Sequence, residues 1–131
     1  MFLARSSDYA VRALCFLSNN KGRTVSAKEL VKETGIPYPF LRKLLQVLGK
    51  KKILVSRKGL NGGFELNRKA SSIYLREIIE IFQGPFKVTE CNLGKRVCPN
   101  RGYCKLKHKM DEVEEQVLKT LEGISIAGLC S

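Results

Sequence analysis

The sequence lacks several features that would place it in common classes of protein. No run of roughly 18 apolar residues occurs in its 131 residues, so it predicts neither a membrane-spanning helix nor a membrane partner. Residues 1–12 lack the basic region, apolar run and small-residue cleavage site of a secretory leader. A Gly-rich nucleotide loop and paired acid and base residues are also absent, which disfavours an enzyme. We therefore expect a cytoplasmic protein that is not an enzyme.

Acidic residues are scarce in the first half of the chain. Residues 1–70 carry 15 Lys or Arg against 4 Asp or Glu, a net charge of +11, whereas residues 71–131 carry 9 against 8, a net charge of +1. Nearly all of the total charge of +12 therefore lies in the N-terminal half, and this excess favours a polyanionic partner such as nucleic acid. A solvated basic surface is the alternative, and charge alone does not separate the two.

Histidine occurs once and cysteine five times, an odd number. A reducing cytosol disfavours structural disulfides, so clustered cysteines favour metal or redox chemistry. Cys91, Cys98 and Cys104 lie within 14 residues, and neighbouring Lys and Arg residues favour their thiolate form. Cys15 lies among apolar residues and is interpreted as core filler. Cys130 lies in a tail that we expect to be mobile, where it is either incidental or a redox thiol.

Two kinds of metal site fit three cysteines. One is an iron–sulfur cluster with a fourth ligand that is not cysteine, and the other is a tetrahedral zinc site of three cysteines and one histidine. His108 follows Cys104 by four residues, so on a helix both side chains face the same way. Zinc sites more often contain two cysteines about two to four residues apart, and this segment lacks such a pair, so the spacing favours a cluster. A metal-free loop is the alternative.

Capping residues predict two helices near the N-terminus. Ser6 and Ser7 are placed to cap the first helix. Ser26 and Glu29 have the spacing of a capping box for the second, in which each side chain bonds the other residue's backbone. Gly35 then supplies the left-handed residue that ends it.

A third helix follows closely. Pro37 and Pro39 fit only its start, and its predicted buried stripe consists of Leu41, Leu44, Leu45 and Leu48. Its outer face carries basic and amide side chains, namely Arg42, Lys43, Gln46 and Lys50. Two short helices joined by a tight turn, the second with such a face, indicate a helix-turn-helix.

A β-hairpin is expected next. Residues 53–55 form one strand and residues 64–66 the return strand, joined by the basic, Gly-rich segment 56–63. Glycines there permit positive φ angles and a close approach to a partner, and Arg57 and Lys58 supply charge. Directly after a helix-turn-helix, such a hairpin is a wing.

Two more amphipathic helices complete the pattern. Residues 75–82 form one, which ends at Gly84-Pro85. Residues 105–121 form a longer one, whose apolar stripe consists of Leu106, Met110, Val113, Val117 and Leu121. The N-terminal helices already suffice for one core, so we expect this stripe to pack on a second copy of the chain. Packing within the same chain is the alternative.

Together these features resemble a family of bacterial winged-helix regulators of the Rrf-two type, which includes the iron–sulfur cluster regulator IscR, the nitrite-sensitive repressor NsrR, RirA and CymR. The resemblance covers nearly the whole chain. It rests on Asp8–Leu14 in the first helix, Gly35-Ile36 before a Leu-rich helix, the wing Lys58–Phe64, residues 73–84 and the three-cysteine loop.

The resemblance implies a mainly α fold: a winged helix-turn-helix with a small two-stranded wing and a long C-terminal dimerisation helix. It implies a homodimer that binds pseudo-palindromic promoter DNA, with the third helix in the major groove and the wing in the minor groove. Lys58 occupies the position of the usual wing arginine, although arginine suits a narrow minor groove better. By position, the candidate DNA contacts are Ser26, Lys28, Tyr38, Arg42, Lys43, Arg57, Lys58 and Gly59.

The resemblance also implies that Cys91, Cys98 and Cys104 hold a cluster of the 4Fe–4S or 2Fe–2S type. The gap between the first two holds six residues where relatives usually have five. For the fourth ligand, relatives have either a His shortly after the third cysteine or a carboxylate from the partner's first helix. His108 comes one position late for the first pattern, and Asp8 matches the second, so we favour Asp8 from the partner chain.

We therefore predict a transcriptional repressor whose promoter affinity changes when an iron–sulfur cluster is gained, lost or attacked. The alternative is a thiol-switch or zinc-stabilised repressor without a cluster. Three regions are expected: residues 1–84 as the DNA-binding domain, 85–104 as the cluster-binding loop, and 105–131 as the dimerisation helix and tail. The sequence leaves the signal open among nitric oxide, iron supply, oxygen and cysteine metabolism.

Overall fold

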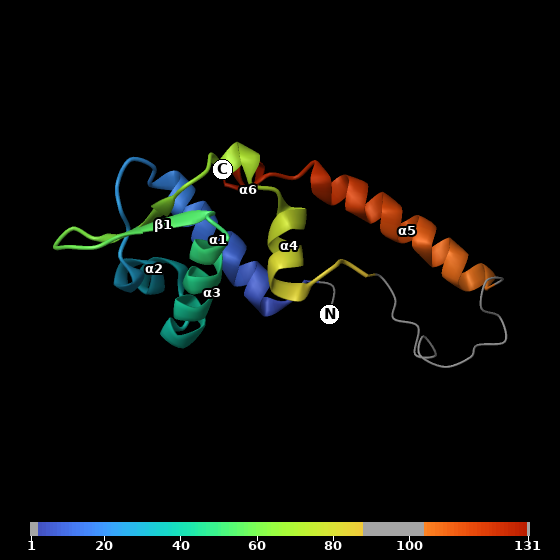
Figure 1. Cartoon of the computed structure of the whole chain (residues 1–131), viewed down its shortest axis with the longest axis horizontal. Coiled ribbons are helices and arrows are strands. Elements are labelled where there is room, and N and C mark those ends of the chain that lie inside the picture. The colour runs from blue at the N-terminus through green and yellow to red at the C-terminus, as the bar shows by residue number, and fades with distance from the viewer. Residues whose placement is uncertain (1–2, 88–103, 131) are drawn as a thin grey trace.

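The first part of the chain forms a winged head, here residues 3–83, from which one long helix projects (Figure 1). The computed structural model describes residues 3–87 and 104–130. Over these residues the chain is mostly helical with one two-stranded antiparallel sheet, which confirms the predicted fold class. The elements are α1 (Arg5–Asn19), α2 (Ala27–Thr34), α3 (Tyr38–Lys50), β1 (Leu54–Arg57), β2 (Gly63–Leu66), the 3-10 helix η1 (Ala70–Ser72), α4 (Leu75–Gln83), α5 (Lys105–Glu122) and α6 (Ile126–Leu129).

Helix α1 is capped from a distant part of the chain. Ala4 is its N-cap residue and makes no side-chain capping bond, so the prediction that Ser6 or Ser7 caps this helix was wrong. The Ala4 amide and the fully buried Ser7 hydroxyl both donate to Oε1 of Gln83, at 2.9 and 2.7 Å. Gln83 is the last residue of α4, so the two helices share one partly buried acceptor. A tertiary contact has replaced the local cap.

Helix α2 begins and ends as predicted. The Ser26 side chain accepts a hydrogen bond of 3.1 Å from the Glu29 amide, and Gly35 ends the helix with a φ of +73°. The reciprocal half of the capping box is absent, because the Glu29 carboxylate binds the Arg23 guanidinium at 2.5 Å instead. Mainly through that hydrogen bond, Arg23 holds the pKa of Glu29 below its usual value.

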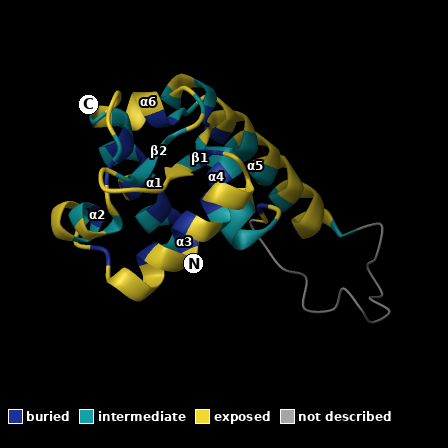
Figure 2. Ribbon diagram, turned by 60° about the vertical axis from the view of Figure 1, so that its left-hand side comes forward, coloured by how far each residue is buried: buried dark blue, intermediate teal, exposed yellow. Residues whose placement is uncertain are grey.

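The main core lies around α1, which contacts α2, α3, α4, α6 and β2. The four leucines predicted to face inward from α3 are all buried, which confirms the stripe. Figure 2 shows these buried positions on the inner sides of the helices, with exposed residues on the outer sides. Each fully buried leucine contributes about 2 kcal/mol through loss of water contact, so α3 is held firmly against the head.

The wing is bound to the head by backbone hydrogen bonds. Strands β1 and β2 pair from Leu54 with Leu66 to Arg57 with Gly63, so β1 extends two residues beyond the predicted strand. Val25 and Phe64 exchange two backbone hydrogen bonds of 2.8 and 2.9 Å. The Val25 segment therefore acts as a third, one-residue strand, which fixes the angle of the wing.

Helix α5 packs on the head only near its C-terminal end. There Leu121 joins Ile79 and Phe86 in a second small core, and Val117 and Leu118 pack against it. Further along the predicted stripe, Val113 is 45% and Leu106 71% exposed in the single chain. Among the described residues, packing within the chain thus covers the C-terminal end of the stripe, leaves Met110 partly exposed and leaves Val113 and Leu106 exposed. Within the described ranges, no helix combines the length and apolar character needed to cross a membrane.

The C-terminal segment is folded, contrary to the expectation of a mobile tail. Ile126 is fully buried, and its amide donates to the Ile73 carbonyl at 2.8 Å. Cys130, at the end of α6, forms a disulfide with Cys15 of α1. The interpretations of Cys15 as core filler and of Cys130 as incidental were therefore incomplete, because these residues lie 115 positions apart and no local pattern pairs them.

Gly63→Ala is expected to destabilise the head. A Cβ atom at this position would lie 2.5 Å from the Val25 carbonyl oxygen, so backbone must shift at the base of the wing. We expect a loss of about 1–3 kcal/mol in the free energy of unfolding, measured by chemical denaturation. Gly49→Ala in α3 is the control, because nothing lies within 4 Å of its added Cβ and helix propensity favours it by about 0.5–1 kcal/mol. Equal stability of Gly63→Ala and the parent would contradict this close approach.

Candidate nucleic-acid interface and cysteine site

A hollow of about 670 Å³ lies between α3, the wing and the start of α2. Apolar side chains from the core form part of its wall, and cationic and amide side chains form the rest. Such a surface suits the phosphates and base edges of a nucleic acid. The residues that line it are Ala27, Tyr38, Arg42, Leu45, Gln46, Gly49, Lys52, Leu54, Val55, Ser56, Phe64 and Asn67.

Two of the predicted DNA contacts meet in this hollow. Tyr38 and Arg42 both line it, and both side chains are exposed. Lys43 is also exposed but lies on the other flank of α3, where it lines a smaller apolar pocket of about 230 Å³ with Phe40 and residues of α1. The structure therefore places Tyr38 and Arg42 together and Lys43 apart from them.

Four polar residues of the hollow were missing from the predicted contacts, namely Gln46, Lys52, Ser56 and Asn67. Helical spacing placed Gln46 on the outer face with Arg42, four residues before it, but Gln46 was not named as a contact. Lys52 and Asn67 come from the turns on either side of the hairpin. There the side-chain amide of Asn67 donates to the backbone carbonyl of Lys52 at 2.9 Å. Lys52 adopts a positive φ of 61°, which neither helical nor strand periodicity predicts.

The start of α2 forms one edge of this surface. Ser26 and Lys28 are both exposed there. The N-terminal amides of a helix and a nearby lysine together attract an anion, so these residues are placed as a phosphate contact. The prediction for them is compatible with their position.

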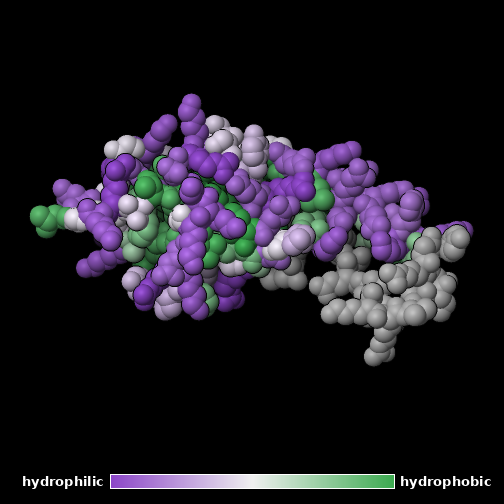
Figure 3. Space-filling view, viewed as in Figure 1, coloured by the Kyte–Doolittle hydropathy of each residue, from purple (hydrophilic) through white to green (hydrophobic). Residues whose placement is uncertain are grey.

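The wing presents its tip to solvent. Residues 58–61 are all exposed, and Gly59 has a φ of +118° that only glycine adopts without strain. Arg57 forms an ion pair of 2.5 Å with Glu65 across the hairpin, so part of its charge is neutralised there. Leu60 is a fully exposed apolar residue, and Figure 3 shows a hydrophobic side chain at the end of the wing. The Thr24 hydroxyl donates to the Asn61 carbonyl at 2.6 Å and holds the tip to the head.

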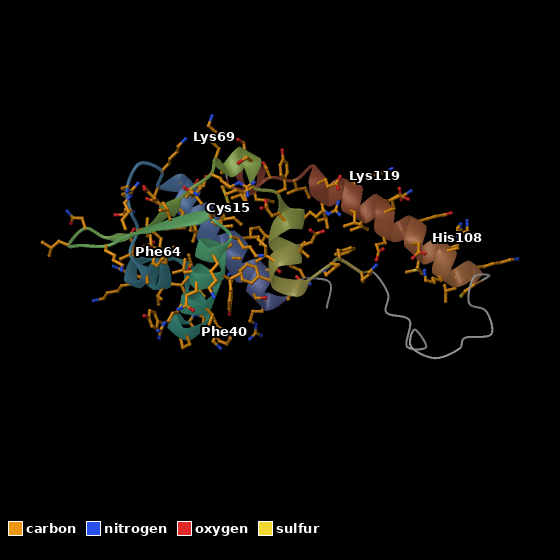
Figure 4. The ribbon with its side chains drawn as sticks, in the orientation of Figure 1. Cys15, Phe40, Phe64, Lys69, His108 and Lys119 are labelled. Carbon is orange, nitrogen blue, oxygen red and sulfur yellow. A yellow bond between two sulfur atoms is a disulfide. The ribbon has the colours of Figure 1, made fainter. Side chains whose placement is uncertain are left out.

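The cysteine site is described only at its C-terminal edge. Cys104 is the N-cap residue of α5 and carries a free, half-buried thiol. The backbone amide of His108 donates to the Cys104 carbonyl at 3.1 Å, and its side chain is exposed near the far end of the helix (Figure 4). Cys91 and Cys98 lie outside the described residues.

Asp8 lies on α1, within the head. Its half-exposed side chain pairs with Arg12 at 3.3 Å. The start of α5 lies at the end of the molecule farthest from the head, so a single chain keeps Asp8 apart from Cys104 (Figure 1). Among residues 3–87 and 104–130, no three His, Cys, Asp or Glu side chains converge as a metal site. A thiol and a carboxylate are nevertheless donors that fit an iron–sulfur cluster, if they are brought together across two chains.

Known proteins resemble this chain over almost its full length. A protein of Aquifex aeolicus named as an HTH-type transcriptional regulator is 33% identical over 98% of this chain and 91% of its own length. The HTH-type transcriptional regulator NsrR of Oceanobacillus iheyensis is 30% identical over 98% of this chain and 89% of its own length. Both relatives are regulators of transcription by name.

Solved structures share the fold. The global cysteine regulator CymR of B. subtilis superposes with a TM-score of 0.80 at 18% identity, covering 99% of this chain and 96% of its own. IscR of T. potens gives a TM-score of 0.77 at 24% identity, covering 98% and 85%. The family model Rrf2, described as iron-dependent transcriptional regulator, matches residues 3–131. These matches confirm the family resemblance, and the chain belongs to the Rrf2 family of DNA-binding transcriptional regulators, which are not enzymes.

Proposed function

We propose that this regulator is a cytoplasmic repressor whose affinity for promoter DNA is set by an iron–sulfur cluster. Cys91, Cys98 and Cys104 would hold the cluster, and Asp8 from a second copy of the chain would complete it. The observation that carries this proposal is the free thiol of Cys104 at the first turn of α5. A ligand there fixes the junction between the cysteine loop and the helix that leads back to the head.

The surface around the hollow between α3, the wing and the start of α2 is proposed to bind duplex DNA. Helix α3 would enter the major groove, with Arg42 and Gln46 directed at base edges from adjacent turns. The wing tip would enter the minor groove through Lys58, with Arg57 beside it. Lys43, on the other flank of α3, would contact a phosphate and add affinity without sequence preference.

Arg42→Ala is expected to weaken promoter binding about 10- to 100-fold, because it removes a side chain that reaches base edges. Binding to random duplex should fall much less, and the ratio is measured by fluorescence anisotropy at fixed salt. Lys43→Ala should instead weaken binding to promoter and random duplex alike. It should also reduce the slope of log affinity against log salt concentration by about one. Lys119→Ala is the control, because this exposed cation lies on α5, away from the wing (Figure 4). An equal loss for Arg42→Ala and Lys119→Ala would contradict the assignment.

The uncovered stripe of α5 is proposed to form the core of a homodimer. Two copies crossing through α5 would cover Leu106 and Val113, which the single chain leaves exposed. A two-fold axis through these helices pairs two heads, as a pseudo-palindromic operator requires. It would also carry the cysteine loop of one chain toward α1 of the other, where Asp8 lies.

Val113→Glu is expected to convert the dimer to a monomer, because a carboxylate would be buried unpaired at the crossing. Light scattering after size-exclusion chromatography gives the mass, and promoter affinity should fall with it. Glu115→Gln is the control, since its side chain on the same helix is 70% exposed. A Val113→Glu protein that keeps the mass of a dimer would place the interface elsewhere.

A thiol-switch repressor without a cluster is the second candidate, and the Cys15–Cys130 disulfide is the observation that favours it. A zinc-stabilised repressor using His108, one turn after Cys104, would also keep the same DNA-binding head. When bound, a cluster supplies exposed iron that nitric oxide and oxygen attack and that depends on iron supply. Zinc supplies none of this chemistry, so the metal content separates the candidates.

The cluster proposal is tested with anaerobically purified protein, by iron and sulfide analysis, by its visible spectrum and by gel shift on its own promoter. We expect the cluster-loaded and cluster-free forms to differ in promoter affinity. Cys98→Ala should lose the visible absorbance and remain a dimer, and Asp8→Ala should weaken the chromophore more than His108→Ala does. Retained absorbance in Cys98→Ala would remove the site as described. Equal binding of promoter and random duplex by both forms would remove the regulatory role.

A further inference from the structure

A second sulfur site lies far from Cys104, the one described cysteine of the proposed cluster site. Cys15, in α1, and Cys130, at the end of α6, are joined in the structure with their Cα atoms 5.1 Å apart, well within the usual range for a disulfide. Figure 4 labels Cys15 in the head, whereas α5 begins at the opposite end of the molecule. Within one chain, the pair is therefore apart from Cys104.

Backbone contacts hold the two cysteines together independently of the sulfur bond. The Ile126 amide donates to the Ile73 carbonyl and the Leu75 amide to the Ile124 carbonyl, both at 2.8 Å. Ser125 caps α6, which packs against α1 and η1. Because these contacts position α6, Cys130 stays beside Cys15 when both are thiols.

Both cysteine residues are also partly exposed. Both cysteines are half-buried and pack at the margin of the main core, not in its centre. A pair of adjacent, partly exposed thiols is the arrangement that passes readily between dithiol and disulfide. In a reducing compartment such a bond is transient and not a permanent structural link.

We propose that Cys15 and Cys130 form a reversible redox site that hydrogen peroxide oxidises. One thiolate attacks a peroxide oxygen, which breaks the O–O bond, forms a sulfenic acid and releases water once a proton is taken up. The second thiolate attacks that sulfenic sulfur, forms the S–S bond and expels the hydroxyl group as a second water. Two thiols and one peroxide thus give one disulfide and two waters, and two electrons pass from sulfur to oxygen.

The bond would clamp the junction between α5 and the head. Only residues 123–125 separate the end of α5 from α6, and Ser125 forms a backbone bridge with Tyr74 just before α4. Oxidation therefore adds a covalent link between α1 and α6, next to the base of α5, and reduction leaves that junction to the backbone contacts and the small core around Leu121. Oxidation would change the distance between the two winged heads of a dimer only if the proposed dimer forms. The redox site itself does not depend on the dimer.

The full-length protein is reduced, treated with hydrogen peroxide, alkylated and digested for mass spectrometry. We expect one cross-linked peptide pair joining Cys15 to Cys130, and a rise of about 10 °C in the unfolding midpoint, because a disulfide closing so long a loop restricts the unfolded chain strongly. Cys130→Ser and Cys15→Ser should each lose this rise, and Ala127→Ser, at an exposed position of the same short helix, is the control and should keep it. Cys130→Ser alters only the end of α6, so it tests the site even if Cys15→Ser folds poorly.

Two results would overturn the proposal. One is alkylation of both Cys15 and Cys130 after peroxide treatment, and the other is a midpoint rise that survives in Cys130→Ser. Neither measurement uses DNA or iron, so failure of the cluster proposal leaves them unaffected.

Discussion

The two backbone hydrogen bonds between Val25 and Phe64 are the constraint on which the surface between α3 and the wing depends. They join the segment before α2 to the wing, so the helix-turn-helix and the hairpin form one rigid unit. They add to the packing of Phe64 and Leu66 against the main core, and a two-stranded hairpin without such support is marginally stable in water. The hollow that contains Tyr38 and Arg42 exists because α3 and the wing are held at a fixed angle.

The sequence was enough to predict the elements that are stabilised by interactions between residues close in the chain. Ser26 and Gly35 bound α2 as expected, because each acts within one helical turn of its own position. The leucine stripe of α3 was equally readable, since helical spacing places one face against the core. For the candidate site, periodicity placed both Arg42 and Gln46 on the outer face of α3 correctly, although Gln46 was not named as a DNA contact.

Features made by distant residues were not predictable in this way. Gln83 caps α1 from nearly 80 positions away, and Glu29 exchanges its expected local partner for Arg23. Helix α6 is only four residues long and is stabilised by docking, so its sequence carries too few apolar repeats to announce it. The predicted ligation by Cys91 and Cys98 stays a prediction, because both lie outside the described residues.

The exposed wing tip separates stability from recognition. Lys58 and Leu60 project into solvent, so exchanging them removes little packing, whereas Gly63 beneath them touches the Val25 backbone. Under the proposed contact of the tip with DNA, point changes at the tip would therefore alter operator preference without destabilising the head. Because the base of the hairpin is held by the Val25 backbone, the residues at its tip are free to change during evolution.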